Sequence, residues 1–107
     1  MTDKAILAIV ERGKAEFIVE KAKEAGAEGA TIVYGRGTGE KEFQKFFNLH
    51  IESSKEIILI VTDSNKAEPI QEAIIKAGHL DKPGTGIVFM VSIENLFGLK
   101  HREEIDM

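Results

Sequence analysis

The two halves of this chain repeat each other. Shifting the sequence by 52 positions aligns residues 6–26 with residues 58–78, and nine of these 21 positions are identical. Further along, Ile32-Val33-Tyr34 matches Ile87-Val88-Phe89 once three residues are inserted into the second half. Amphipathic helices share some residues by composition alone, but that does not explain equivalent glycines and apolar runs in both halves. The 107-residue chain is therefore expected to hold two copies of one structural unit in a single domain, residues 1–107.

Each half is expected to form a strand, a helix and a second strand. Runs rich in β-branched residues, too short for helices, open both halves at Ala5–Val10 and Ile57–Thr62. The closing strands are predicted at Thr31–Gly35 and Ile87–Ile93. Between them, apolar residues recur at helical spacing, with Ile70, Ala73, Ile74 and Ala77 as the clearer example.

Local signals set the expected helix boundaries. We predict Gly13 and Asn65 as the N-caps, each followed three residues later by a glutamate that can reach back to the cap. Pro69 would then fall in the first turn, where a missing N–H removes no helical hydrogen bond. Gly26 and Gly78 stand where a left-handed residue would end each helix.

Two such units indicate an α+β, ferredoxin-like β-α-β-β-α-β fold, an antiparallel four-stranded sheet with both helices on one face. A sheet with one wet face should alternate apolar and polar residues. Ile57–Val61 and Ile87–Val91 are instead apolar throughout, and Tyr34 is expected in the core. Two helices cover one face only, so the other is predicted to be buried against copies of the chain in a closed, obligate oligomer.

Composition excludes several classes of function. With no cysteine, the chain has no disulfides, no thiolate nucleophile and no cysteine-type zinc site. A net charge of −4 argues against nucleic-acid binding. The apolar runs are too short to span a bilayer, so no membrane insertion is expected. The first residues do not resemble a signal peptide, because Asp3 precedes a short apolar stretch that ends at Glu11, and we expect a cytoplasmic protein.

Two glycine clusters occupy corresponding points of the repeat. Gly35-Arg36-Gly37 closes the second strand, and Gly84-Thr85-Gly86 precedes the fourth. Glycine lets the backbone approach a ligand and direct its N–H groups at an anion. Neither cluster is a Walker A loop or a Rossmann fingerprint, and both remain open to interpretation as plain turns. Lys100-His101-Arg102 is a compact cationic cluster, or else part of a solvated tail spanning residues 98–107.

Signals for catalysis are weak. His50, His79 and His101 show no metal-ligand spacing, and no serine lies in a nucleophile elbow. We therefore expect no enzyme, no metal and no covalent cofactor. Phe43, Phe46 and Phe47 lie among charges in the loop Glu40–Leu49, where they pack on the protein's own core or form a surface for a partner.

Together, the repeat, Gly35-x-Gly37 and Gly84-Thr85-Gly86-Ile87-Val88-Phe89 resemble the PII signal-transduction proteins over nearly the whole chain. The resemblance implies a homotrimer whose sheets face inward, with an adenine nucleotide (ATP, ADP or AMP) in the clefts between subunits. It also implies a regulator of nitrogen metabolism that senses energy and 2-oxoglutarate and acts on a partner protein. This chain resembles a divergent member of the family.

Carried over to this sequence, the resemblance makes residues 38–49 a short T-loop equivalent and residues 80–86 a B-loop equivalent. The family's lysine after the second B-loop glycine is Ile87 here, and its Arg-x-Arg aligns with Gly98-Leu99-Lys100. Lys82, Lys100 or Arg102 would supply the missing charge. The short T-loop contains no tyrosine, so uridylylation is not expected. The nucleotide-binding residues implied are Gly35, Arg36, Gly37, Gly84, Thr85, Gly86 and Lys100.

The leading hypothesis is a PII-like trimeric regulator that binds an adenine nucleotide and thereby changes the order of residues 38–49. Two alternatives stay open. One is a protein-binding adaptor whose nucleotide site has decayed, as Ile87 and Gly98 would permit. The other is a trimer of the metal-tolerance, CutA-like kind.

Overall fold

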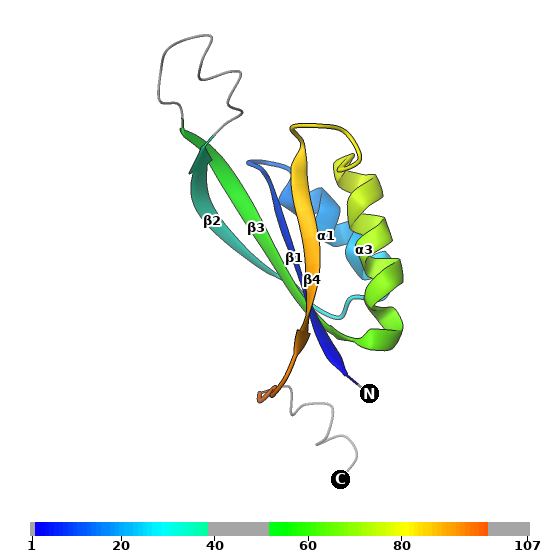
Figure 1. Ribbon diagram of the computed structural model, residues 1–107. Helices are drawn as coiled ribbons and strands as arrows, with labels where there is room; N and C mark the ends of the chain where they lie inside the picture. Colours follow the sequence, from blue (N-terminus) through cyan, green and yellow to red (C-terminus); the bar gives the residue numbers. More distant parts are fainter. Residues whose placement is uncertain (1, 39–51, 99–107) are drawn as a thin grey trace.

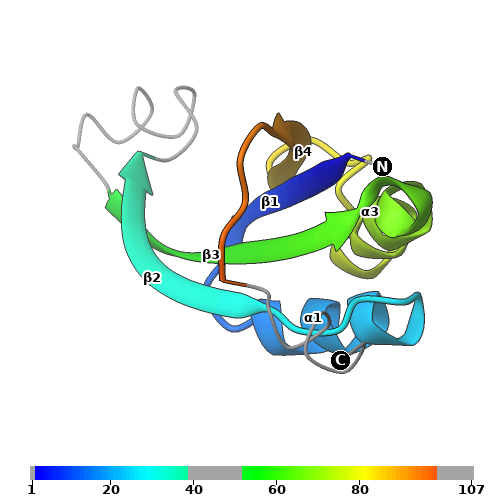
Figure 2. The same cartoon turned by 90° about the horizontal axis from the view of Figure 1, so that it is seen from below.

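The computed structural model describes residues 2–38 and 52–98. It shows one antiparallel sheet in the order β2-β3-β1-β4, with both helices on the same face (Figures 1 and 2). This confirms the predicted α+β, ferredoxin-like arrangement. The elements are β1 (Asp3–Glu11), α1 (Ala15–Glu24), β2 (Thr31–Thr38), β3 (Glu52–Asp63), α3 (Ser64–Gly78) and β4 (Gly86–Ile93). None of the helices in the described part of the chain is long and apolar enough to cross a membrane.

The core lies between the two helices and the sheet face they cover. Alternate residues of the two central strands point to this face and interlock with one stripe of each helix. Their burial supplies most of the hydrophobic stabilisation of the single chain. The largest fully buried side chains are Ile6 and Val10 of β1, Ile58 and Ile60 of β3, Ile18 of α1, and Ile70 and Ile74 of α3.

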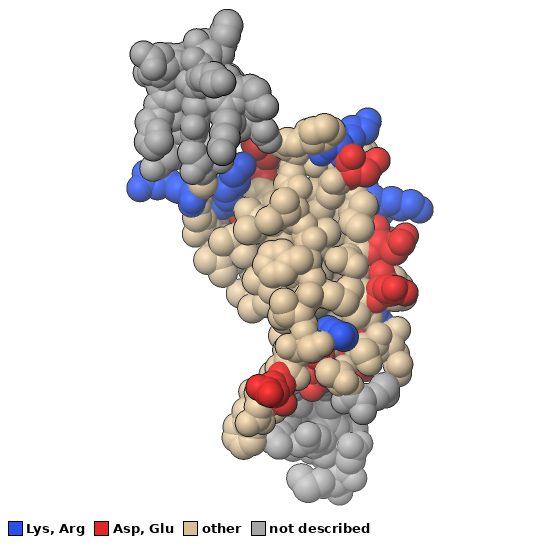
Figure 3. Space-filling view, viewed as in Figure 1, with Lys and Arg blue, Asp and Glu red and all other residues tan. Residues whose placement is uncertain are grey.

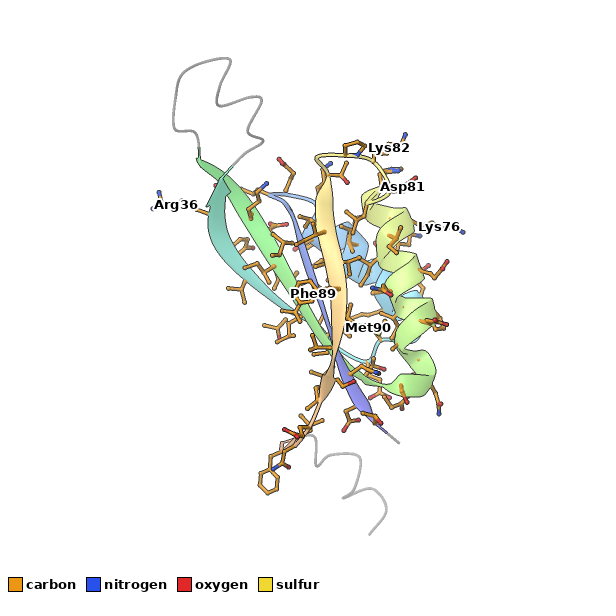
Figure 4. The ribbon with its side chains drawn as sticks, in the orientation of Figure 1. Arg36, Lys76, Asp81, Lys82, Phe89 and Met90 are labelled. Atoms are coloured by element: carbon orange, nitrogen blue, oxygen red, sulfur yellow. The ribbon has the colours of Figure 1, made fainter. Side chains whose placement is uncertain are left out.

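The opposite face of the sheet, here called the open face, is apolar and uncovered within one chain. Phe89 lies on this face, whereas its neighbour Met90 packs against the core (Figure 4). Figure 3 shows a broad area without charged side chains over the middle of the sheet. The strands are therefore apolar on both faces, as the sequence predicts. Exposed residues of this face are Val33 (48%), Leu59 (36%), Ile87 (55%), Phe89 (41%) and Val91 (45%).

The expected match between Tyr34 and Phe89 is wrong, because the two residues lie on opposite faces of the sheet. Tyr34 pairs with Glu56 and so shares the helix-covered face, whereas Phe89 pairs with Leu7 on the open face. A shift of one residue exchanges the two faces of a strand, so an insertion of three residues cannot align the two halves. The strand pairing instead aligns Val33, opposite Ile57, with Val91, opposite Ala5, which corresponds to six inserted residues. Tyr34 is also not in the core. It lies at the edge strand, beyond the cover of the helices, and is 72% exposed.

The N-caps differ from those predicted. Asp63, not Asn65, caps α3, because its carboxylate accepts hydrogen bonds from the N–H groups of Asn65 (3.1 Å) and Lys66 (3.3 Å). The helix therefore starts earlier, and Pro69 lies inside it, beyond the first turn. At α1 the cap position is Lys14, not Gly13, and its side chain makes no capping hydrogen bond.

Of the two glycines predicted to end the helices, Gly26 has this role and Gly78 does not. Gly26 follows the last turn of α1 with a positive φ of 126°, as expected. In α3 the left-handed residue is His79 (φ 54°, ψ 42°), and Gly78 is still helical. A side chain at Gly78 would meet Ile18 Cδ1 at 3.1 Å, so this glycine lets the two helices approach closely. It serves packing, not helix termination.

Candidate functional site

The fold brings the two glycine clusters to the same end of the sheet. One row of paired residues runs across all four strands, from Gly86 through Val10 and Glu56 to Tyr34, which is followed by Gly35. Neighbouring strands lie about 4.8 Å apart, so the two ends of this row are separated by about 14 Å. The clusters therefore occupy opposite edges of one end of the sheet. Within a single chain they are too far apart to contact the same small anion.

The turn that leads into β4 contains two glycines, and the second of them, Gly86, cannot be replaced without strain. Gly84 and Gly86 have φ angles of 81° and 148°, which side chains rarely tolerate. A Cβ on Gly86 would also lie 2.5 Å from the carbonyl oxygen of Ile9 on the neighbouring strand. The backbone of Gly86 thus passes against β1, and the turn presents main chain at its surface.

Thr85, between these glycines, stabilises the turn from within. Its hydroxyl lies 2.8 Å from the carbonyl oxygen of His79 and 2.9 Å from that of Lys82. One hydroxyl proton serves one acceptor at a time, so the two carbonyls share it. The side chain of Thr85 is thus directed into the loop, and the turn offers a ligand its backbone.

A cavity of about 350 Å³ adjoins the other glycine cluster. Two cationic side chains, Arg12 and Lys55, stand beside Gly35 there, and Lys55 is paired with Glu11 at 3.3 Å. The Arg12 N–H donates to the carbonyl oxygen of Ser54 (3.3 Å), which joins the loop after β1 to β3. The complete lining is Arg12, Gly13, Tyr34, Gly35, Ser54, Lys55 and Glu56.

A buried carboxylate forms one wall of this cavity. Glu56 is 7% exposed, and its Oε1 accepts a hydrogen bond of 2.8 Å from the N–H of Ala15. Ala15 is the first residue of α1, so a side chain from β3 caps the helix that Lys14 leaves uncapped. The positive end of the helix dipole also favours a carboxylate at this place. Glu56 is not identified in the sequence analysis. The sequence signal that could have found it is a charged residue directly before the apolar run Ile57–Val61.

Replacing Glu56 with alanine should therefore destabilise the protein by about 1–3 kcal/mol, because it leaves a buried helix N–H without an acceptor. Glu56→Gln should lose less, since its amide oxygen can still accept that hydrogen bond. Urea unfolding at fixed protein concentration measures both. Glu16→Ala, an exposed change in the same helical turn, is the control; an equal loss in both alanine variants would contradict this role.

The predicted site residues are distributed over two places. Gly35, Arg36 and Gly37 form the end of β2, with Arg36 on the outer edge of the sheet (Figure 4). Gly84, Thr85 and Gly86 form the turn at the other edge, next to Lys82. Lys100 and Arg102 lie outside the described residues, as does the segment 39–49. No cluster of three or more metal-ligating side chains occurs within residues 2–38 and 52–98.

Residues 3–103 match the family model described as nitrogen regulatory protein P-II. A GlnB-like protein 1 of the nitrogen fixation nifHD region of Methanothermobacter marburgensis is 30% identical over 102 residues, covering 94% of this chain and 97% of the relative. The protein of the same description from Methanococcus maripaludis is 26% identical over 100 residues, covering 92% and 95%. Among solved structures, B. subtilis GlnK in complex with ATP superposes with a TM-score of 0.68 at 16% identity, covering 86% of this chain and 82% of GlnK.

Proposed function

The chain belongs to the family of nitrogen regulatory protein P-II, and we propose that it acts as a trimeric, cytoplasmic regulator that binds an adenine nucleotide between its subunits. Proteins of this family are regulators, not metabolic enzymes. The regulated partner would belong to nitrogen metabolism, in keeping with the nitrogen-fixation relatives. The proposed domain is the whole chain, 1–107, with residues 38–49, 80–86 and 98–107 as its T-loop, B-loop and C-terminal tail.

The placement of the two glycine clusters carries this proposal. They lie at one end of the sheet but at opposite edges, Gly84–Gly86 beside β4 and Gly35–Gly37 on β2. In a ring with cyclic symmetry, one edge of each subunit faces the opposite edge of the next. Each interface would then bring a B-loop turn to the glycines of a neighbouring β2.

The open face supports the trimer. Leaving five large apolar side chains of one sheet face in water is unfavourable, and a contiguous patch of this kind marks an interface. The face extends over central and edge strands alike, so an interface that buries it must cover the whole sheet. Three copies around an axis, each turning this face inward, would bury it and remain closed.

The chemistry of the two clusters suits a phosphorylated ligand. The positive φ angles of Gly84 and Gly86 suit a backbone nest of the kind that binds anions, and Lys82 stands beside the turn (Figure 4). At the other cluster, Arg12 and Lys55 line the cavity next to Gly35. We propose ATP, ADP or AMP as the ligand, bound by Gly35, Arg36, Gly37, Gly84, Thr85, Gly86 and Lys100, with Thr85 acting through the turn that its hydroxyl stabilises.

Regulation would act through residues 38–49, which join β2 to β3 directly after Gly37. A ligand that contacts Gly35–Gly37 in only one arrangement of this segment shifts the population toward that arrangement. The segment's aromatic residues, Phe43, Phe46 and Phe47, would then be presented to the partner or withdrawn from it.

Calorimetric titration with ATP, ADP and AMP tests nucleotide binding. We expect up to one nucleotide per chain, and about tenfold weaker binding in Lys100→Ala, because a charge-assisted phosphate contact contributes about 1.5 kcal/mol. Lys66→Ala is the matched control, since Lys66 pairs with Glu28 at the opposite end of the sheet. Unchanged affinity in Lys100→Ala would remove Lys100 from the site.

One observation favours the adaptor alternative. Ile87 replaces a phosphate-binding lysine of the family, and its side chain lies on the open face, 55% exposed. A chain that had lost nucleotide binding would tolerate this change. Absence of binding at millimolar ATP, ADP and AMP in a trimeric protein would select the adaptor. The family match favours either version over the CutA-like alternative.

A further inference from the structure

A groove of about 580 Å³ lies between α1 and α3, on the solvent side of the helix layer. Its floor consists of small side chains, Ala25, Ala73 and Ala77, which allow another element to approach the backbone closely. Phe17 stands at its edge and is 51% exposed, so its ring adds apolar surface to the groove. The groove therefore has an apolar floor with charged side chains at its sides, and it is separate from both glycine clusters.

Cationic side chains border the groove from both helices. The Lys21 ammonium lies 5.5 Å from the centre of the Phe17 ring and 3.5 Å from the Glu24 carboxylate, so its stem is held along the groove. Lys76 of α3 projects outward (Figure 4), and within the described part of the chain it has no ion-pair partner. Glu24 also lines the groove and balances Lys21, so Lys76 leaves the lining with an excess of one positive charge in a chain that carries −4 as a whole.

We propose that this groove docks an amphipathic helix of the regulated partner protein, with acidic side chains flanking an apolar stripe. Small floor residues fit the apolar stripe, Phe17 packs against its side, and the lysines pair with the acids. Residues 17–25 span about 12 Å along α1, enough for two turns of a docked helix. The inference rests on the proposed regulatory function, since it names where the partner binds.

The groove stays accessible in the proposed trimer. The helices and the open face lie on opposite sides of the sheet (Figure 2), so burying one leaves the other exposed to a partner. The partner would then contact the protein at two places, the nucleotide-dependent segment 38–49 and this constant groove. Two linked contacts bind more tightly than either does alone.

Selection from a library of 16-residue helical peptides on the immobilised full-length protein tests the proposal. We expect the selected peptides to carry Asp or Glu beside apolar residues spaced three or four apart. We also expect Lys76→Glu to weaken their binding at least tenfold, measured by fluorescence anisotropy of the labelled peptides. Lys23→Glu, which reverses a charge on α1 outside the groove, should leave their affinity unchanged.

Three results would overturn the inference: no selectable peptide, selection of basic peptides, or equal binding to wild type and Lys76→Glu. A change of oligomeric mass in Lys76→Glu would show instead that the groove holds a second copy of the chain, which also contradicts it. ATP titration of the wild-type protein, alongside the peptide selection, separates the two proposals. Nucleotide binding retained without peptide binding refutes only the groove, and the reverse refutes only the nucleotide site.

Discussion

Replacing Phe89 with glutamate is expected to convert the assembled protein into single chains at micromolar concentration. Phe89 lies in the middle of β4 on the open face, 41% exposed in one chain. In a closed trimer the change places three carboxylates in the buried interface, and each unpaired buried charge costs several kcal/mol. Sedimentation velocity measures the result directly, and nucleotide binding should disappear with the clefts.

Phe17→Glu is the matched control for this change. Phe17 is an aromatic residue of comparable exposure on the helix layer, away from the open face. Its replacement should leave the assembly intact, which shows that the position of the charge matters, and not the loss of an aromatic side chain. A Phe89→Glu variant that kept the wild-type mass would refute an interface on the open face.

Replacing Gly86 with alanine is expected to cost about 3 kcal/mol or more in the free energy of unfolding. The φ of 148° alone costs an alanine about 1–3 kcal/mol. The new Cβ would in addition meet the Ile9 carbonyl oxygen at 2.5 Å, which forces β4 away from β1 where Gly86 pairs with Val10. Urea unfolding at fixed chain concentration measures the loss, and calorimetry should show weaker nucleotide binding.

Gly13→Ala separates backbone strain from the collision. Gly13 also has a positive φ, 92°, but no atom lies within 4 Å of a Cβ built there. This variant should lose about 1 kcal/mol, from strain alone. Equal losses in the two glycine variants would contradict the close approach of β4 to β1.

The architecture was predictable because the repeat and the apolar runs constrain it at several levels at once. Two copies of strand, helix and strand leave few topologies for a chain of this length, and the pairing β2-β3-β1-β4 is the one observed. The apolar character of both strand faces was also readable. Ile87, Phe89 and Val91 alternate with Val88 and Met90, so one set faces the core and the other the open face.

Details that depend on a one-residue register were not predictable. An insertion of three residues in the second half aligns Tyr34 with Phe89, whereas the strand pairing puts the two residues on opposite faces and leaves Tyr34 exposed. The glutamate three residues after Asn65, Glu68, points to Asn65 as the cap of α3, whereas Asp63 serves both as the last residue of β3 and as the cap. Periodic signals locate elements well and their ends poorly.

The candidate site was only partly readable, because its parts come from different strands. The glycine turns were visible as local patterns. The capping of α1 by Glu56 joins residues 41 positions apart, and the pairing of Lys55 with Glu11 joins residues 44 apart. Such contacts follow from the sheet register and leave no local pattern in the sequence.

Native mass spectrometry of the wild-type chain, with and without ATP, tests the central claim most directly. The account predicts one species of three chains, three times 11.8 kDa or about 35 kDa, that gains up to three nucleotides. A folded species of 11.8 kDa persisting at micromolar concentration would contradict it, because a single chain leaves its open face in water and holds its two glycine clusters apart.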